Sequence, residues 1–203
     1  MRDSLLRALD RTAVDPLHDD LDTLRTRLVA QASAAGALDL GYRTLDSPLG
    51  LLLVAATDLG LARLAYAVED HDAVLETLAS DIGTRILRDD KRFDDLAAQL
   101  DGYFTGRRRS FDVPLDLRLS RGFRLDVLRH LREIPWGRTE TYSEVAAATG
   151  SPRAVRAVGT ACATNPVPII VPCHRVLRAD GALGGYLGGV EAKRRLLELE
   201  AAA

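Results

Sequence analysis

The order of apolar and polar positions along the chain divides it into three segments. The first carries a leucine stripe at spacings of four, three and four residues, formed by Leu17, Leu21, Leu24 and Leu28. Such spacing is typical of one face of an amphipathic helix, and Asp15 and Pro16 suit its N-cap and first position. We expect the stripe to pack on the body of the chain, with a partner surface as the alternative. A shorter helix is predicted before it, around Leu5, Leu6 and Leu9.

The second segment changes to short apolar runs separated by turns, after an Ala- and Gly-rich stretch that marks a boundary near residue 38. Turns at Ser47–Gly50 and Thr57–Gly60 separate three such runs, which predicts a three-stranded antiparallel meander over 40–68. The pattern then predicts a helix, a short strand and a second helix, over His71–Ser80, Arg85–Leu87 and Phe93–Phe104. Residues 1–38 are therefore predicted to be a helical extension and residues 39–115 an α+β domain.

The third segment, residues 116–203, is predicted to be mostly helical. One helix face is formed by Phe123, Val127, Leu128 and Leu131. Two short helices follow, and Ser151 and Pro152 between them suit the N-cap and first position of the second helix. This order resembles a helix-turn-helix unit. Taken alone it is weak support for DNA binding, because most helix pairs only pack against each other.

Composition and charge narrow the classes of protein that fit. Of 203 residues, 47% are hydrophobic, which is enough for a folded core, and the net charge of -2 excludes a polybasic or acidic tail. Residues 1–100 hold 11 basic and 18 acidic side chains, whereas residues 101–203 hold 16 and 11. A polyanion should therefore prefer the second half. The basic run Arg107–Arg109 fits either a solvated linker or a phosphate contact.

Neither a membrane span nor a disulfide scaffold is expected. Prolines interrupt the longest uncharged run, Ala157 to His174, and the charged N-terminus lacks the apolar core of a signal peptide. We therefore expect a cytoplasmic protein with no membrane partner. The two cysteines, Cys162 and Cys173, have no metal-binding spacing, so no metal site is expected.

The segment from Asn165 to Val176 has the features of a reactive site. Three prolines stiffen its backbone around an apolar stretch and hold Cys173 in a fixed place. A thiol attacks as the thiolate, and an imidazole or a cationic neighbour such as His174 or Arg175 favours that form. A buried structural cysteine fits the same residues, because unpaired cysteines are among the most buried residue types.

Together these motifs resemble the O6-alkylguanine-DNA alkyltransferase family. The sequence PCHRV follows NPVPI and TYSEVA...RAVG and precedes GGY...GG, and the resemblance runs from about Tyr42 to Glu200. It implies a ribonuclease H-like N-terminal domain with a three-stranded antiparallel sheet, followed by a winged helix-turn-helix domain. It also implies a monomeric methylated-DNA–protein-cysteine S-methyltransferase that binds double-stranded DNA in the minor groove and rotates out O6-alkylguanine. The alkyl group then moves to its own cysteine once, without a cofactor; O4-alkylthymine is a possible second substrate.

The resemblance assigns five catalytic roles. Cys173 matches the nucleophile, His174 the base that takes its proton through a water, and Glu200 the residue that orients the histidine. Asn165 matches an asparagine that bonds nearby backbone, and Tyr142 a tyrosine whose hydroxyl faces N3 of the extruded base. From the residues alone, Glu200 would be an exposed charge, Asn165 a turn former and Tyr142 the start of a helix.

Further residues match the family's DNA surface and base pocket. The DNA-binding positions are Ser151, Arg156, Ala157, Gly159 and Thr160, on a helix with few bulky side chains. Arg156 matches an arginine that fills the gap left by the flipped base, although an exposed arginine is also commonplace. The pocket positions are Pro168, Val176, Tyr186, Leu187 and Gly188. At position 187 several relatives have a polar residue, whereas this chain has Leu187. Gly188 has no side chain where some relatives carry a large one, which predicts a roomy pocket. Cys162 is expected in the core.

Two other functions fit parts of the pattern. A lesion-sensing DNA-binding protein of the same fold would not transfer the alkyl group, but related non-catalytic proteins lack the cysteine that this chain keeps. A Cys/His hydrolase would need an oxyanion hole, for which the sequence gives no sign. The sequence therefore favours the alkyltransferase.

Overall fold

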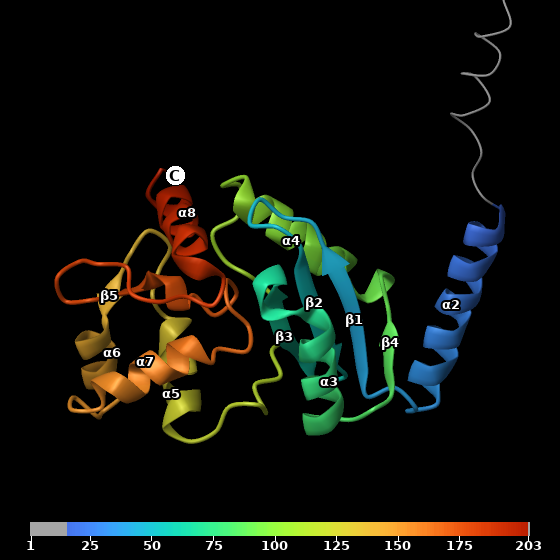
Figure 1. The fold of residues 1–203 in the computed structure, drawn as a ribbon, viewed down its shortest axis with the longest axis horizontal. Helices are drawn as coiled ribbons and strands as arrows, with labels where there is room; N and C mark the ends of the chain where they lie inside the picture. Colours follow the sequence, from blue (N-terminus) through green and yellow to red (C-terminus); the bar gives the residue numbers. More distant parts are fainter. Residues whose placement is uncertain (1–15, 203) are drawn as a thin grey trace, which may run out of the picture.

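A four-stranded sheet forms the centre of the N-terminal half (Figure 1). The structure is a computed structural model and describes residues 16–202. As predicted, β1 (Leu40–Leu45), β2 (Leu52–Thr57) and β3 (Gly60–Tyr66) pair as an antiparallel meander. The predicted short strand, β4 (Ile86–Arg88), joins β1 in parallel and extends the sheet to the order β3-β2-β1-β4.

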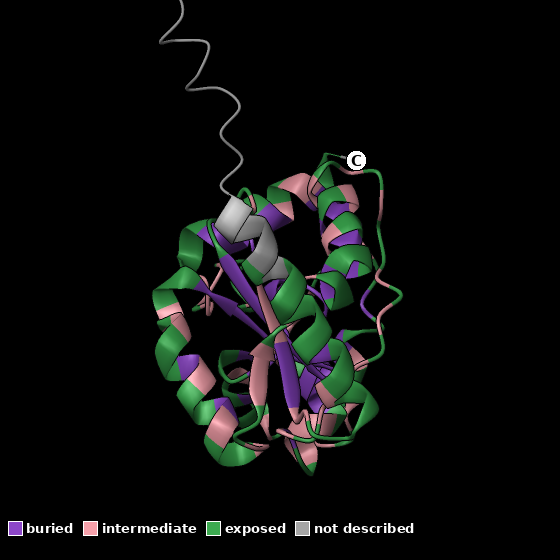
Figure 2. Ribbon diagram, turned by 90° about the vertical axis from the view of Figure 1, so that its right-hand side faces the viewer, coloured by how far each residue is buried: buried purple, intermediate pink, exposed green. Residues whose placement is uncertain are grey.

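Both faces of this sheet are covered, which explains why β2 and β3 are buried at nearly every position (Figure 2). The helix α3 (His71–Asp81) packs over one face, where Val74 and Leu78 join a small buried cluster. The other face contributes to a larger core, which also takes in α4 (Asp94–Phe104) and the C-terminal half. The fold is α+β, as predicted.

The C-terminal half is helical around a short parallel strand pair. Its helices are α5 (Phe123–Leu131), α6 (Tyr142–Ala148), α7 (Val155–Ala163) and α8 (Gly189–Ala201), and its strands are β5 (Glu140–Thr141) and β6 (Val176–Leu177). Residues 16–202 also contain three 3-10 turns, of which two lie in the N-terminal half: η1 (Ala67–Glu69), η2 (Lys91–Phe93) and η3 (Cys173–Arg175). The α6·α7 and α5·α7 packing gives the helix-turn-helix arrangement that the sequence predicts.

The predicted start of α7 is wrong. Its N-cap is Ala154 rather than Ser151, and the helix begins at Val155. The backbone N–H of Ala154 instead donates to the Ser151 carbonyl at 2.8 Å, so these residues close a turn with Pro152 at its second position. Proline favours that turn position as strongly as the first position of a helix, and the sequence does not separate the two.

The helix α2 (Pro16–Ala34) stands at the β4 edge of the molecule (Figure 1). Its start at Pro16 and its helical state are as predicted, but the expected burial of the leucine stripe is wrong. Leu21, Leu24 and Leu28 are 59%, 59% and 53% exposed, because the helix meets the body through another side, where Val29 is 6% exposed. The first predicted helix, Asp15 and the Leu17 side chain lie outside the described residues. No helix within 16–202 is long and apolar enough to cross a membrane.

Because the stripe is exposed, replacing Leu21, Leu24 and Leu28 together by Gln should change the free energy of unfolding by no more than about 0.5 kcal/mol per site. The matched variant Val29→Ala removes buried methyl groups and should cost about 1–2 kcal/mol. Urea denaturation of both variants measures this contrast. A loss in the triple variant well above the sum of three surface changes, about 1.5 kcal/mol, would show that the stripe is packed in solution.

Candidate active site

The loop that carries Cys173 is buried along its whole length from Asn165 to Val176. The Asn165 Oδ1 accepts the backbone N–H of Val167 at 3.0 Å, which makes the turn that the sequence predicts for an asparagine before proline. Ile169 has a φ of 72°, a left-handed conformation that costs a β-branched residue about 1–3 kcal/mol. Surrounding packing therefore holds this backbone in one shape and fixes the position of η3.

The thiol of Cys173 is buried and bonded by Asn165. The Asn165 Nδ2 donates both to Cys173 Sγ at 3.2 Å and to the Val171 carbonyl at 2.8 Å. Burial raises the pKa of the Cys173 thiol to about 11, and the Asn165 hydrogen bond and the charge on Lys193 keep it from rising further. The resting thiol is therefore protonated near neutral pH and needs a base to react.

Glu200 is the hub of the buried polar network beside this thiol. Its Oε1 accepts from Tyr103 Oη at 2.7 Å and from Arg175 Nη2 at 2.8 Å, and lies 2.9 Å from His174 Nε2. Its Oε2 accepts from Arg175 Nε at 2.9 Å and from the Gly137 N–H at 3.3 Å. Burial alone would raise the pKa of Glu200, but the bonds and charges of His174 and Arg175 hold it at about 2. The alternative of an exposed surface charge at Glu200 is wrong.

His174 points toward Glu200 and has no hydrogen bond to the neighbouring thiol. Burial lowers the pKa of His174 more than the Glu200 carboxylate raises it, so the imidazole is neutral near pH 7. With Nε2–H donating to Glu200, Nδ1 is the acceptor, and this buried atom has no partner among the described residues. The pair thus presents one basic nitrogen inside the site.

The sequence does not predict the roles of two buried residues at this site. Tyr103 reaches Glu200 from α4, so the N-terminal half contributes directly to the network. Lys193 of α8 is fully buried and its Nζ donates to the carbonyls of Val176, at 2.6 Å, and Leu183. The sequence holds no sign of either role, because a tyrosine in an amphipathic helix indicates only core and a lysine in a charged helix indicates only surface.

Tyr142 and Tyr186 each contact a different part of the site. Tyr142 is the first residue of α6, and a Cβ on Gly184 would lie 3.1 Å from its hydroxyl, so the glycine leaves room for the phenol. Burial raises the pKa of Tyr142, which keeps its proton available for donation. Tyr186 bonds Tyr66 Oη at 2.8 Å and packs its ring edge-on against His174.

The sequence predicts that the missing side chain of Gly188 leaves a roomy pocket, and the structure shows no free space beside this residue. A Cβ on Gly188 would lie 2.8 Å from ring atoms of Tyr66, so the space without a side chain is filled by this tyrosine of β3. Val176 and Pro168 are buried in the loop, and the half-buried Leu187 packs against the core cluster that contains Cys173. Room for a substrate at this end depends on Tyr66.

The predicted DNA-binding residues lie on α7 and the turn before it. Arg156, Ala157 and Thr160 are exposed together, and Gly159 and Ser151 are half-buried. Nothing stands within 4 Å of a Cβ on Gly159, so close approach to this helix is unhindered. Cys162 faces inward and is buried, as predicted. Residues of this exposed face make no hydrogen bond to the buried network around Cys173. The DNA-binding face and the thiol site are therefore separate parts of the C-terminal half.

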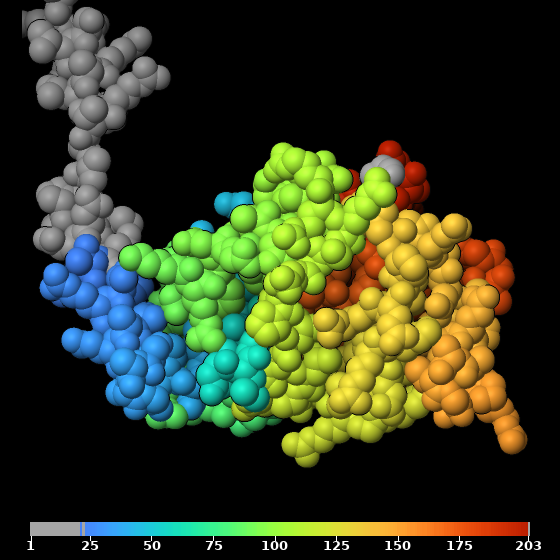
Figure 3. Space-filling view, turned by 180° about the vertical axis from the view of Figure 1, so that it is seen from behind, coloured from blue at the N-terminus to red at the C-terminus, as the bar shows by residue number. Residues whose placement is uncertain are grey.

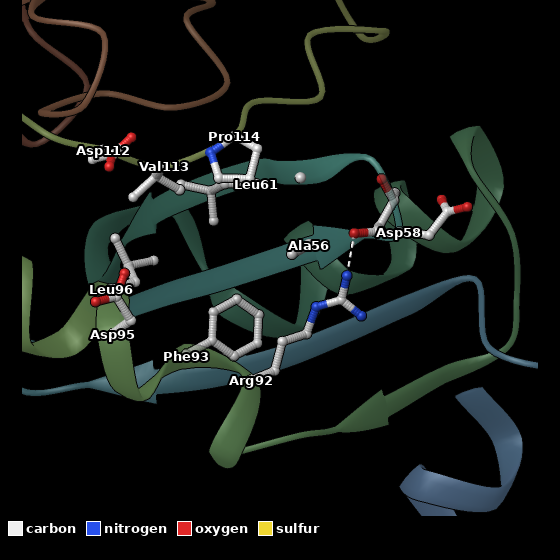
Figure 4. A pocket seen from close by; sticks show the side chains of 12 residues that line it. Ala56, Asp58, Leu61, Arg92, Phe93, Asp95, Leu96, Asp112, Val113 and Pro114 are labelled. Carbon is white, nitrogen blue, oxygen red and sulfur yellow. Dashed lines mark hydrogen bonds between the residues drawn. The ribbon is translucent and has the colours of Figure 1, made fainter. Parts of the chain in front are cut away.

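A further pocket, of about 190 Å³, lies on the sheet away from this chemistry (Figure 4). It is bordered by β2, β3, α4 and the segment at Pro114, and its charged lining consists of Asp58, Arg92, Asp95 and Asp112. Arg92 donates to the Thr57 carbonyl, as Figure 4 shows. The lining of this pocket contains neither a cysteine nor a histidine. Within residues 16–202, no three His, Cys, Asp or Glu side chains converge to hold a metal ion.

Comparisons with known proteins match both halves of the chain. The ribonuclease-like domain of 6-O-methylguanine DNA methyltransferase matches residues 40–117, and its DNA-binding domain matches residues 122–202. A methylated-DNA–protein-cysteine methyltransferase of Mycobacterium tuberculosis is 44% identical over 159 residues, covering 78% of this chain and 91% of that protein. The constitutive one of Bacillus subtilis is 39% identical over 163 residues, covering 78% and 94%.

Solved structures agree with these matches. The crystal structure of Mycobacterium tuberculosis OGT in complex with DNA aligns with a TM-score of 0.69 at 42% identity, covering 80% of this chain and 93% of that one. The O6-methylguanine-DNA methyltransferase of Pyrococcus kodakaraensis aligns with a TM-score of 0.55 at 27% identity, covering 79% and 98%.

The low pKa of Glu200 predicts how stability depends on pH. The folded value of about 2 lies below the ordinary 4.5, so the carboxylate's contribution is complete above pH 4.5 and is lost as pH falls through about 2. That difference corresponds to about 3 kcal/mol. We expect the stability gap between wild type and Glu200→Gln to narrow by about this amount on acidification from pH 4.5 to 2, measured by urea denaturation. Glu198→Gln, exposed on the same helix, is the control, and a gap that does not change with pH would contradict the assignment.

Proposed function

This chain belongs to the 6-O-methylguanine DNA methyltransferase family, and we propose that Cys173 is the residue through which it acts. The protein repairs DNA by transferring an alkyl group to one of its own cysteines. The observation that supports Cys173 is its position beside a buried His174–Glu200 pair that can take up its proton. Cys162 lies on the inner side of α7 and has no comparable partner.

The reaction is an SN2 displacement at the alkyl carbon of O6-alkylguanine. The Cys173 sulfur forms the new bond to carbon while the bond from carbon to O6 breaks, leaving a thioether and guanine. The thiol loses one proton and the departing guanine gains one, so neither an oxidant nor a cofactor enters. O4-alkylthymine presents the same bond to an alkyl carbon and is the second substrate that we propose.

Proton transfer divides between the two ends of the site. A thiol with a pKa of about 11 needs a base, and His174 Nδ1 accepts its proton through a bridging water while Glu200 stabilises the resulting imidazolium. Asn165 orients the sulfur. At the other end, the Tyr142 hydroxyl donates to N3 of the guanine as negative charge develops on the base.

The base pocket is lined by backbone groups of Val176 and Leu187 and by the ring of Tyr186. Pro168 and Gly188 complete this lining.

DNA binds through the exposed face of α7. Ala157, Gly159 and Thr160 present small side chains that let the helix enter the minor groove, and Ser151 supplies a contact at the turn. A repair protein needs no sequence readout, which suits the minor groove. Arg156 fills the gap left by the extruded base with its planar guanidinium. One monomer serves one lesion, because water does not readily cleave the thioether.

Replacing Cys173 by Ser should abolish alkyl transfer and leave duplex binding unchanged, because the hydroxyl is nearly the same size but is poorly ionised near pH 7. Transfer from a radiolabelled O6-methylguanine duplex to protein measures the first effect, and fluorescence anisotropy of the duplex measures the second. Cys162→Ala is the matched control and should keep transfer. Label on the serine variant, or its loss in folded Cys162→Ala, would mean that Cys173 is not the acceptor.

Arg156→Ala should slow repair in duplex DNA by about tenfold or more, because base flipping costs a few kcal/mol that this side chain offsets. Reaction with free O6-benzylguanine, which needs no flipping, should keep its rate. The ratio of the two rate constants is the measurement. Equal slowing of both would place Arg156 in the chemistry or in the fold instead of the flipped state.

A further inference from the structure

A groove of about 500 Å³ lies beside α5. It runs between α5 and the segment that connects the two halves, and four of its lining residues are arginines: Arg118, Arg121, Arg129 and Arg132. Figure 3 shows this face, with the yellow-green residues of the connecting segment and of α5 toward the viewer. None of the lining residues belongs to α7, so the groove is distinct from the DNA-binding face of α7.

The charge in this groove is not balanced by its neighbours. Arg118 Nε pairs with Asp116 at 2.6 Å, and Arg129 pairs more loosely with Asp126 at 3.6 Å. Glu133, the next carboxylate along α5, faces His130 instead, at 3.8 Å. The exposed Arg121 and Arg132 have no ion pair with any residue in the range 16–202, so the groove keeps an excess of positive charge.

An unsatisfied hydroxyl lines the same groove. Ser120 is only 2% exposed, and its Oγ has no hydrogen-bond partner in the described part of the chain. Its backbone is held by a bond from its N–H to the Leu117 carbonyl at 2.8 Å. Nearby, α5 begins after Gly122 without a side-chain cap. A buried hydroxyl and an uncapped helix start, flanked by arginines, fit an anionic oxygen acceptor.

The spacing of the positive charges indicates whether the groove suits a single ion or a chain of phosphates. Arg121 and Arg132 flank the nine residues of α5, which span about 13 Å. Two arginines at opposite ends of this helix suit successive phosphates better than they suit a single ion. A DNA strand, with one phosphate for about every 3.4 Å of helix rise, can do so.

We propose that this groove binds the phosphodiester backbone of DNA, as a second contact besides the minor-groove contact of α7. The proposal rests on the proposed function, because the DNA is the one that α7 engages or a second duplex beside it. Each guanidinium contacts a phosphate oxygen, and Ser120 Oγ donates to another. This contact carries no sequence information and serves to hold the protein on undamaged DNA.

The test is the salt dependence of binding to an undamaged duplex, with the variant Arg121→Gln/Arg132→Gln. The slope of log Kobs against log salt is negative, and losing two phosphate contacts should make it less steep by about 2. Arg88→Gln/Arg194→Gln removes the same charge from exposed sites outside the groove and should leave the slope unchanged. Arg121→Lys/Arg132→Lys should restore it. A slope equal to that of wild type in the glutamine variant would overturn the proposal.

Two further experiments test the proposed function separately and distinguish the two sources of the bound DNA. Reaction of the glutamine variant with free O6-benzylguanine should keep the wild-type rate; failure of wild type itself to react would instead count against the proposed function. A duplex only long enough to cover α7 tells the two DNA sources apart. If the slope difference persists on it at excess duplex, a second duplex is bound; if the difference needs a longer duplex, the same one continues into the groove.

Ser120→Ala tests the hydroxyl separately. Removing a buried group without a partner should leave the free energy of unfolding unchanged or raise it. Affinity for undamaged duplex should fall about two- to tenfold, the range of one hydrogen bond. Unchanged affinity in the stable variant would remove Ser120 from the binding surface.

Discussion

The buried carboxylate of Glu200 is the interaction on which the rest of the site depends. Burial opposes its charge, and His174 and Arg175 of η3 keep it ionised. Tyr103 of α4 and the Gly137 backbone also donate hydrogen bonds to it. Losing one donor would leave a buried charge short of partners, which is far costlier than losing a surface pair. The two halves of the molecule are therefore held in register by the same group that orients the imidazole.

This arrangement prepares the site without ionising the proposed nucleophile in advance. Cys173 stays protonated in its apolar surroundings, and Asn165 fixes the direction of its sulfur. The neutral His174 has one nitrogen, Nδ1, that can accept a proton. A resting thiol is protected from oxidation, because the thiolate is the reactive form. For a protein that uses its cysteine once, such protection preserves activity until a lesion is bound.

Local patterns predicted much of this molecule, and contacts between distant residues account for what they missed. The meander followed from its turns, and a set of spaced motifs around Cys173 led to His174, Asn165 and Glu200. Tyr103 lies 97 residues from the carboxylate it bonds, and nothing in its own helix indicates that partner. Likewise the leucine stripe of α2 had the right period for burial, but only the position of the helix at the β4 edge shows that it is exposed.

The most direct test of the account is a mass measurement on intact wild-type protein after incubation with a duplex that contains one O6-methylguanine. The account predicts that each molecule gains one methyl group, that peptide mapping places it on Cys173 with Cys162 unmodified, and that the lesion becomes guanine in equal amount. Repair of many lesions by one protein molecule, or a methyl group on any other residue, would contradict it.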